Sequence, residues 1–229
     1  METQKGITYS VDIVMCIDST GSMNPLIDNV KSNAISFYED LSKSMEEKDK
    51  FVDNLRIKVI PFRDYYASDG QESMKESEFF DMPDQREEFS SFVNSIRATG
   101  GGSAPECGLE ALSKAIRSDW TDSGDKQRQI IALWSDINPH PLEKNKDSKP
   151  SSYPDDMPSN FDELTNIWAG QGGPMKYSAK RLLVFAPDAE FWTDIGNYWD
   201  NSVHYASKAG KGLEDVDYDT ILDAIAGSV

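Results

Sequence analysis

Five short and nearly continuous apolar runs constrain the fold of this chain more than any other feature. They lie at residues 11–17, 55–62, 130–134, 181–185 and 202–205. Apolar runs of this length without polar alternation are typical of strands buried on both faces of a parallel sheet. A further edge strand, antiparallel to its neighbour, is predicted near residues 77–80.

Helical periodicity fills the segments between these runs. Apolar residues step by three and four along residues 27–41, 89–96 and 109–116, and a last helix is expected at residues 220–226. Strands that alternate with helices predict an α/β fold in which a mostly parallel central sheet has helices on both faces. The 229 residues suit a single domain, with a core from about residue 9 to about residue 226.

The expected ends of two helices follow from side-chain chemistry. Ser22 or Asn24 is expected to cap the helix that begins near Pro25, because short polar side chains accept hydrogen bonds from the first amides of a helix. Asp217 or Asp219 is expected to cap the last helix for the same reason.

Aromatic and sulfur side chains are expected in the core. Trp192, Tyr198 and Trp199 lie at helical spacing, which favours a buried cluster. Cys16 lies inside the first apolar run and is expected to be a buried, reduced thiol. With Cys107 as the other cysteine, the chain has too few for a disulfide framework.

The charge balance limits the partners. The chain carries 40 acidic and 23 basic residues, a net charge of −17. A surface of this sign repels nucleic acids and anionic membranes, so neither is an expected partner. No apolar stretch approaches the ~20 residues of a membrane span, and the N-terminal segment lacks a signal-peptide pattern. We expect a cytoplasmic protein, monomeric by itself, whose partner is a protein or a cation.

The first apolar run ends in a group of oxygen-bearing side chains. Asp18 closes the strand, and Thr20 and Ser22 follow at alternate positions on either side of Gly21. A buried strand that ends in one carboxylate and two hydroxyls offers several hard oxygen atoms from one tight loop. Such oxygen atoms favour Mg²⁺, Mn²⁺ or Ca²⁺ over softer metals.

Two further segments are predicted to meet this loop. A glycine-rich loop at residues 99–106 precedes the helix that starts near Pro105, and Asp136 ends the strand at residues 130–135. Ligands of open α/β sheets bind beyond the carboxyl ends of the strands, where the strand order reverses. If the two strands flank that reversal, Asp18 and Asp136 face each other across one crevice.

The charges of this group suit a divalent ion. Two carboxylates balance the charge of the ion, and neutral hydroxyls and waters complete its coordination. An ion held mainly by neutral ligands stays electrophilic, so it can accept one more carboxylate from another molecule. This is a binding mechanism that requires no catalysis, and Mg²⁺ is the expected cofactor.

These residues resemble the metal-ion-dependent adhesion site (MIDAS) of the von Willebrand factor A (vWA) domain. The family pattern is Asp-x-Ser-x-Ser, then a Thr in a second loop and an Asp in a third. Asp18, Thr20 and Ser22 match the first part, with Thr20 in place of the first Ser, and Asp136 matches the third. The resemblance covers nearly the whole chain. It implies a Rossmann-like vWA fold whose ion binds an Asp or Glu of a protein partner, and no enzyme activity.

Within the family, the chain is similar to intracellular microbial members associated with tellurium resistance and with alpha-kinases. The shared motifs are Asp-Ser-Thr-Gly-Ser-Met at residues 18–23, Phe-Arg-Asp-Tyr at 62–65, Gly-Gly-Gly-x-x-Pro-Glu at 100–106 and Phe-Trp at 191–192. The resemblance therefore implies an intracellular, bacterial protein.

The ligand from the second loop has three candidates. The similar members usually carry an Asp after the three glycines, where this chain has Ser103. Ser103 occupies the place of the family's Thr, so it is the expected ligand, and Thr99 or Glu106 could reach the ion instead. Asp64 after the second strand and His140 after the third site segment are additional candidates for the metal or its rim.

Residues 138–160 form a long, highly charged loop that holds five of the eleven prolines. The loop leaves the strand end that carries Asp136, and loops of this length are often functional. We therefore expect this insertion in the domain to border the ion and to contribute to the choice of partner.

Two other function classes remain open. Phosphatases of the haloacid dehalogenase type also place Asp after the first strand and bind Mg²⁺, but Thr20 replaces their second Asp here. The chain also lacks a Gly-x₄-Gly-Lys-Ser/Thr nucleotide motif and a credible Ser/His/Asp set. A Mg²⁺-dependent phosphatase-like hydrolase is the first alternative, and a metal-free scaffold that uses its acidic surface is the second.

Overall fold

The predicted alternation of strands and helices is present along the described chain. The structure is a computed structural model that describes residues 8–34, 36–66, 73–100, 105–144, 149–170, 173–211, 213 and 217–229. The strands are β1 (Thr8–Asp18), β2 (Phe51–Phe62), β3 (Phe80–Met82), β4 (Lys126–Trp134), β5 (Lys180–Pro187) and β6 (Ser202–Ser207). The α-helices are α1 (Asn24–Asn33), α2 (Phe37–Glu46), α3 (Arg86–Ser95), α4 (Gly108–Ile116), α5 (Phe161–Ala169), α6 (Glu190–Tyr198) and α7 (Tyr218–Ser228), and a 3₁₀ turn (Gly21–Met23) precedes α1.

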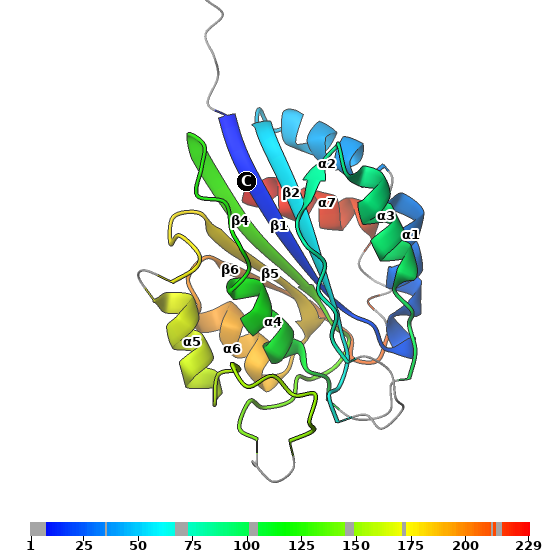
Figure 1. The fold of residues 1–229 in the computed structure, drawn as a ribbon, viewed down its shortest axis with the longest axis vertical. Helices are drawn as coiled ribbons and strands as arrows, with labels where there is room; N and C mark the ends of the chain where they lie inside the picture. Colours follow the sequence, from blue (N-terminus) through cyan, green and yellow to red (C-terminus); the bar gives the residue numbers. More distant parts are fainter. Residues whose placement is uncertain are drawn as a thin grey trace, which may run out of the picture.

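Within the described residues, six strands form one sheet in the order β3-β2-β1-β4-β5-β6 (Figure 1). Neighbouring strands are parallel except β3, which runs antiparallel to β2 at one edge. The order reverses at β1, because β2 and β3 lie on one side of it and β4, β5 and β6 on the other. The predicted fold class, a mostly parallel α/β sheet with one antiparallel edge strand, is confirmed.

The sheet separates two layers of the core, and the central strand β1 contributes side chains to both. Side chains alternate between the faces of a strand, so Ile13 and Met15 pack with α1, α2, α3 and α7, whereas Val14 and Cys16 pack with α4, α5 and α6. Figure 1 shows these two groups of helices on opposite sides of the sheet. All four side chains are at most 1% exposed, which explains why the apolar run is continuous.

Two predicted boundaries differ from the structure. The edge strand lies at Phe80–Met82 rather than at residues 77–80, because Ser77 already binds β2 as a loop residue, its amide donating to the carbonyl of Val59 at 3.0 Å. The helical pattern over residues 27–41 is divided between α1 and α2. Both helices place their apolar residues in the same core layer, so the helical spacing of apolar residues continues across the junction between α1 and α2.

The predicted helix ends are partly correct. Asp217 caps α7, since its carboxylate accepts a hydrogen bond at 2.7 Å from the backbone amide three residues later. The start of α1 has no side-chain cap. The hydroxyl of Ser22 binds Asp136 instead, and the side-chain amide of Asn24 binds Asp28.

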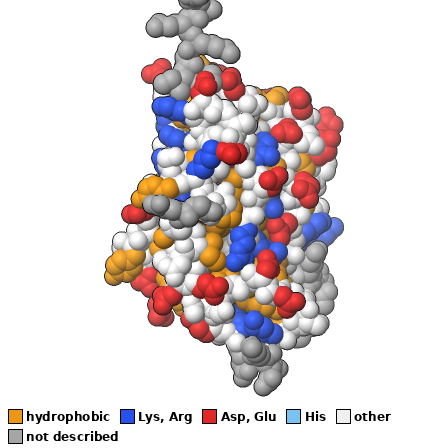
Figure 2. Space-filling view, turned by 60° about the vertical axis from the view of Figure 1, so that its left-hand side comes forward, with side chains coloured by type: hydrophobic (Ala, Val, Ile, Leu, Met, Phe, Trp, Pro, Cys, Tyr) orange, Lys and Arg blue, Asp and Glu red, His pale blue; other side chains and the backbone are white. Residues whose placement is uncertain are grey.

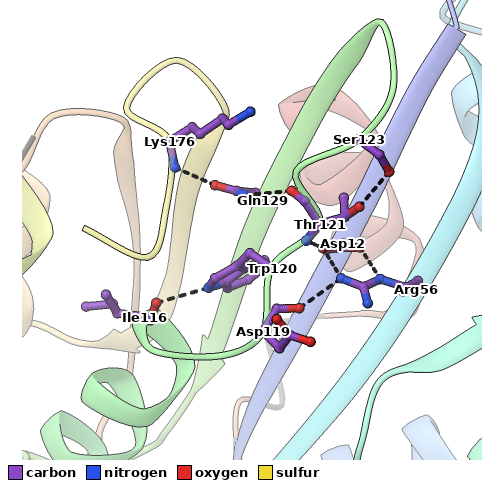
Figure 3. Close-up of polar contacts among 9 residues, drawn as sticks. All are labelled: Asp12, Arg56, Ile116, Asp119, Trp120, Thr121, Ser123, Gln129 and Lys176. Carbon is purple, nitrogen blue, oxygen red and sulfur yellow. Dashed lines mark hydrogen bonds and ion pairs between the residues drawn. The ribbon is translucent and has the colours of Figure 1, made fainter. Parts of the chain in front are cut away.

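A polar network around buried Asp12 fixes the amino end of the sheet (Figure 3). Asp12 on β1 accepts two hydrogen bonds from the guanidinium of Arg56, its register partner on β2, at 2.8 and 2.7 Å. The backbone amide of Thr121 donates a third at 2.6 Å. The guanidinium also donates to the carbonyl of Asp119 at 2.9 Å and lies 4.4 Å from the ring centroid of Phe79. The charge of buried Asp12 is thus matched by a cation of the fold itself.

The loop at residues 138–160 packs against the domain in its described parts, residues 138–144 and 149–160. Leu142 is buried in the core layer of α4, and Tyr153 is buried against Tyr65. Tyr153 also donates a hydrogen bond at 3.0 Å to Glu110, whose side chain is fully buried. These parts of the loop therefore complete the core rather than stand free of it.

The surface carries charges of both signs. Figure 2 shows acidic side chains spread over one face of the molecule, with basic side chains between them. Tyr198 also lies at the surface, 78% exposed, whereas Trp192 and Trp199 are buried. The predicted burial is therefore wrong for Tyr198, the last residue of α6.

In the part of the chain that the structure describes, no helix is long and apolar enough to cross a membrane.

Candidate metal-binding site

Asp18, the last residue of β1, is the centre of the candidate site. Its side chain is fully buried, and the three hydrogen bonds that it accepts all come from uncharged donors. Oδ1 accepts from the amide and the hydroxyl of Thr20 at 3.0 and 2.7 Å, and Oδ2 accepts from the hydroxyl of Ser135 at 2.8 Å. The sheet register explains the last contact, because Ile17 pairs with Trp134 and thereby sets Asp18 opposite Ser135.

Thr20, Ser22 and Asp136 extend this group toward the surface. The hydroxyls of Thr20 and Ser22 are 3.4 Å apart, and the hydroxyl of Ser22 donates to Oδ1 of Asp136 at 3.1 Å. Thr20 and Asp136 are buried, whereas Ser22 is exposed. The structure therefore brings four of the five predicted ligands into one chain of oxygen atoms that begins at buried Asp18 and reaches solvent at Ser22.

The start of the glycine-rich loop is docked on this group. The amide of Gly21 donates to the carbonyl of Gly100 at 3.0 Å, and the amide of Thr99 donates to the carbonyl of Ser19 at 3.1 Å. A Cβ at Gly21 would lie 2.9 Å from the Gly100 oxygen, so this close approach requires glycine. Ser103, the fifth predicted ligand, lies outside the described residues, and its role stays a prediction.

Glu106 is the alternative second-loop residue whose side chain is buried near Asp18. It is 4% exposed, and its Oε2 has no hydrogen-bond partner within the described part of the chain. Its backbone is paired with the segment after β4, because its amide donates to the carbonyl of Asn138 at 3.2 Å and its carbonyl accepts from the amide of His140 at 2.8 Å. The second and third site segments are therefore joined.

Burial raises the pKa of both buried carboxyl groups. The pKa of Asp18 rises from 3.8 to about 6, first because burial disfavours the charged form, with a smaller contribution from the charge of Asp136 and opposed by the hydrogen bonds described above. The pKa of Glu106 rises from 4.5 to about 8 through burial and through the charges of Asp18 and Asp64. The site is thus a buried group of mutually repelling acids.

Asp64 and His140, the predicted rim residues, form a pair. Nε2 of His140 is 3.1 Å from Oδ1 of Asp64, which also accepts a hydrogen bond at 2.8 Å from the amide of Tyr66. Burial lowers the pKa of His140, the charge of Lys144 lowers it further, and Asp64 opposes the change. The two predicted rim residues therefore lie beside each other, although Nε2 of His140 makes no hydrogen bond within the described residues.

Ser135 is a site residue that could not be recognised from the sequence. It precedes Asp136 and reads as the polar end of an apolar strand. Its importance depends on the register of β1 against β4, which sets it opposite Asp18. The sequence feature that pointed to Ser135 was its hydroxyl at the end of a strand predicted to flank the point where the strand order reverses.

The donor set fits a hard divalent cation. Within the described ranges, no group of three or more His, Cys, Asp and Glu side chains is arranged to hold a metal. An ion at this site would therefore depend on hydroxyl oxygens beside the two carboxylates of Asp18 and Asp136. Sites made only of oxygen atoms suit Mg²⁺, Mn²⁺ and Ca²⁺. The uncharged donors around Asp18 also leave its negative charge for such an ion to balance.

Comparison with known proteins identifies the domain. Residues 12–124 match the sequence profile of the von Willebrand factor A domain. The match includes the loop at residues 18–22 and the glycine-rich loop, and it ends before β4 and Asp136. Residues 12–124 therefore match a von Willebrand factor A domain, as the resemblance implied.

Individual relatives are more distant. Alpha-protein kinase vwkA of Dictyostelium discoideum is 27% identical over 160 residues, which are 69% of this chain and 23% of that protein, so this chain spans less than a quarter of that relative. The pilus adhesin SpaC of Lactobacillus rhamnosus GG has a TM-score of 0.56 at 13% identity, over 97% of this chain and 31% of SpaC. The open conformation of SpaC has a TM-score of 0.54 at 14% identity, over 97% of this chain and 30% of SpaC. The likeness to SpaC concerns the fold alone.

Proposed function

We propose that this chain is a binding module that captures a protein partner through a divalent cation held by Asp18, Thr20, Ser22 and Asp136. The von Willebrand factor A domain, which residues 12–124 match, is commonly a protein-interaction module. The observation that carries the proposal is the continuous group of oxygen atoms from buried Asp18 to exposed Ser22. Such a group holds an ion where a second protein can reach it.

Each residue has a distinct part in this proposal. Asp18 and Asp136 supply negative charge, Thr20 and Ser22 supply neutral oxygen atoms, and Ser103 would add one from the second loop. Mg²⁺ is the proposed ion, and Mn²⁺ and Ca²⁺ share its preference for oxygen. When bound, the ion supplies a positive centre that attracts an Asp or Glu carboxylate of the partner.

The proposed activity is binding without catalysis. A phosphatase of the haloacid dehalogenase type would need a second carboxyl group two residues after Asp18, and this position is Thr20. The hydroxyl of Thr20 donates to Asp18 at 2.7 Å, so it acts as a support of that carboxylate. A threonine hydroxyl is also too weak an acid to replace a carboxyl group in proton transfer.

Thermal stability with and without metal tests the ion. After metal is stripped with EDTA and the chelator is removed, saturating Mg²⁺ should raise the Tm, because the ion binds the native state alone. At 100 times Kd, the gain is about 2.7 kcal/mol, or roughly 5–10 °C for a domain of this size. Asp18→Ala should abolish the shift. Asp53→Ala, which removes an exposed carboxylate at the start of β2, should retain it.

Two outcomes of this experiment contradict the proposal. No shift with Mg²⁺, Mn²⁺ or Ca²⁺ would favour a metal-free scaffold. Hydrolysis of para-nitrophenyl phosphate by the wild type that is lost in Asp18→Ala would favour the hydrolase.

Partner capture tests the carboxylate step. Protein retained from an extract of the source organism should require metal and should be lost with EDTA or in Asp18→Ala. Retention that is equal in all conditions would remove the metal from the mechanism.

The loop at residues 138–160 is proposed to contribute to the choice of partner. Its deletion would remove buried Leu142 and Tyr153, so an exposed substitution is the better test. Glu143→Lys reverses one exposed charge beside Leu142. It should leave the metal-dependent Tm shift intact and weaken retention of the partner, and unchanged retention would count against a role for this position.

A further inference from the structure

A cavity of about 180 Å³ adjoins the candidate metal site. Of the predicted metal ligands, Thr99, an alternative candidate from the second loop, is the one that lines this cavity. Its polar lining consists of Ser19, Arg63, Lys75, Ser95, Arg97 and Thr99. Ser19 lies between Asp18 and Thr20 in the chain, and its carbonyl accepts the hydrogen bond from the amide of Thr99. The cavity and the candidate metal site therefore share one wall.

Three basic side chains reach this cavity from three segments. Arg63 follows the end of β2 and is buried at 5% exposure. Lys75 is held beside β2, because its amide donates to the carbonyl of Pro61 at 3.2 Å. Arg97 follows the end of α3. Among the described residues that line the cavity, none is acidic.

This local charge is opposite to that of the whole chain, whose net charge is −17. Lys75 and Arg97 are exposed, and neither forms an ion pair with a carboxylate of the described residues. Lys75 instead lies over the ring of Phe92, with its Nζ 5.1 Å from the centroid. The positive charge of both side chains thus faces a cavity open to an incoming anion.

We propose that the cavity binds a phosphate group carried by a side chain of the protein partner. Guanidinium groups bind phosphate oxygens through paired hydrogen bonds, and the hydroxyl of Thr99 is a further donor in the lining, whereas that of Ser95 already donates to the carbonyl of Phe92 at 2.6 Å. A phosphorylated side chain carries about −1.5 to −2 charge, which matches the two exposed cations, Lys75 and Arg97, better than the single charge of a carboxylate does. The volume also leaves room for the tetrahedral group and part of the side chain that carries it.

This inference takes the protein nature of the partner from the proposed function. The ion would bind a carboxylate, and the cavity would bind a phosphorylated residue of the same partner. Because the two sites share the wall formed by Ser19 and Thr99, a single segment of the partner can occupy both. Phosphorylation of that segment would then strengthen the metal-dependent contact.

Binding of N-acetyl-phosphoserine amide to the metal-free protein tests the cavity by itself. NMR should show saturable shifts of the amides of Lys75, Arg97 and Thr99. Lys75→Glu/Arg97→Glu should weaken binding about tenfold or more. The matched control, Lys31→Glu/Lys43→Glu, makes the same charge change on α1 and α2 and should bind as the wild type does. All four positions are outside the core, and an unchanged Tm verifies folding.

Each other result of this titration overturns the inference. Equal affinity for N-acetyl-glutamate amide would show a carboxylate site rather than a phosphate site. Equal affinity in both double variants, or no saturable binding, would remove the cavity from recognition. Because the titration contains no metal, its outcome is independent of the metal-dependent Tm shift, so the failure of one proposal is distinguishable from the failure of the other.

Discussion

Asp12 and Asp18 lie on the same face of β1, and both are buried, at 1% and 0% exposure. At the amino end of the sheet, Asp12 accepts two hydrogen bonds from the guanidinium of Arg56. At the carboxyl end, all the hydrogen bonds that Asp18 accepts from the described residues come from uncharged donors. The two aspartates are equally buried, and they differ in whether a basic side chain of the described residues is hydrogen-bonded to them.

This difference separates a structural carboxylate from one suited to binding. A buried charge is strongly unfavourable unless it is paired or bound to a metal. Asp12 meets this requirement within the fold, so it ties β1 to β2. Asp18 has no cation among its hydrogen-bond donors in the described residues, and we propose that an external cation balances it while it stays ionised.

The largest expected effect is at the amino end. Arg56→Met leaves Asp12 buried without its cation and should lower the free energy of unfolding by about 3–4 kcal/mol. This value lies toward the lower end of the range for a broken buried ion pair, because the Arg56 side chain is 24% exposed. Urea unfolding measures the loss. The double variant Arg56→Met/Asp12→Asn should recover most of it. A single-variant loss under about 1 kcal/mol would erase the contrast between the two aspartates.

Ser135→Ala should have the next largest effect, at the carboxyl end. The variant removes a donor to the charged carboxylate of Asp18 and should cost about 2 kcal/mol in metal-free solution near pH 8. The cost should fade near pH 5, where Asp18 is protonated. Ser32→Ala, which removes an exposed hydroxyl on α1, is the control and should cost little at either pH. A pH-independent loss would mean that Ser135 serves packing alone.

The pH dependence of stability isolates Asp18 itself. Its folded-state pKa of about 6 lies above the ordinary 3.8, so the stability that it contributes is complete below pH 3.8 and is lost as the pH rises through 6. Without metal, the wild type should lose about 1.5 kcal/mol between about pH 5 and about pH 7.5 relative to Asp18→Asn. Glu106 is present in both proteins, and its pKa stays raised by burial in Asp18→Asn, although the contribution of the Asp18 charge is lost there. Parallel pH profiles of the two proteins would show that Asp18 is already balanced.

Gly21→Ala should have the smallest effect on stability. The added Cβ would meet the carbonyl oxygen of Gly100 at 2.9 Å, and displacing that backbone should cost about 1 kcal/mol. Metal-dependent stabilisation should fall as well, because the second loop is docked there. Gly227→Ala in α7 meets no atom within 4 Å and should be neutral or slightly stabilising. Equal behaviour of the two variants would show that docking of the second loop is unimportant.

Features with a local signature could be predicted from the sequence. Continuous apolar runs marked five of the strands, and the carboxylates at two strand ends marked Asp18 and Asp136. The meeting of these two residues followed from the rule that sheet order reverses between such strands. The use of Ser103 as a ligand remains a prediction.

Features that depend on register or on tertiary packing could not be predicted. The contacts of Asp18 with Ser135 and of Asp12 with Arg56 both depend on which residues stand opposite each other in neighbouring strands. Periodicity also cannot distinguish one helix from two that share a core layer, as at residues 27–41. Tyr198 has helical spacing but ends its helix at the surface.

The double pairing of β1 has a consequence for ligand affinity. β1 is hydrogen-bonded to β2 from Thr8 to Asp18 and to β4 from Tyr9 to Ile17. Strands held on both edges and both faces open rarely, so the amides of β1 should be among the slowest to exchange with solvent. Asp18 is therefore presented in a preorganised position, and a ligand that binds there immobilises little additional chain. At Asp18, the loss of chain entropy on binding, which weakens sites built on free loops, should therefore be small.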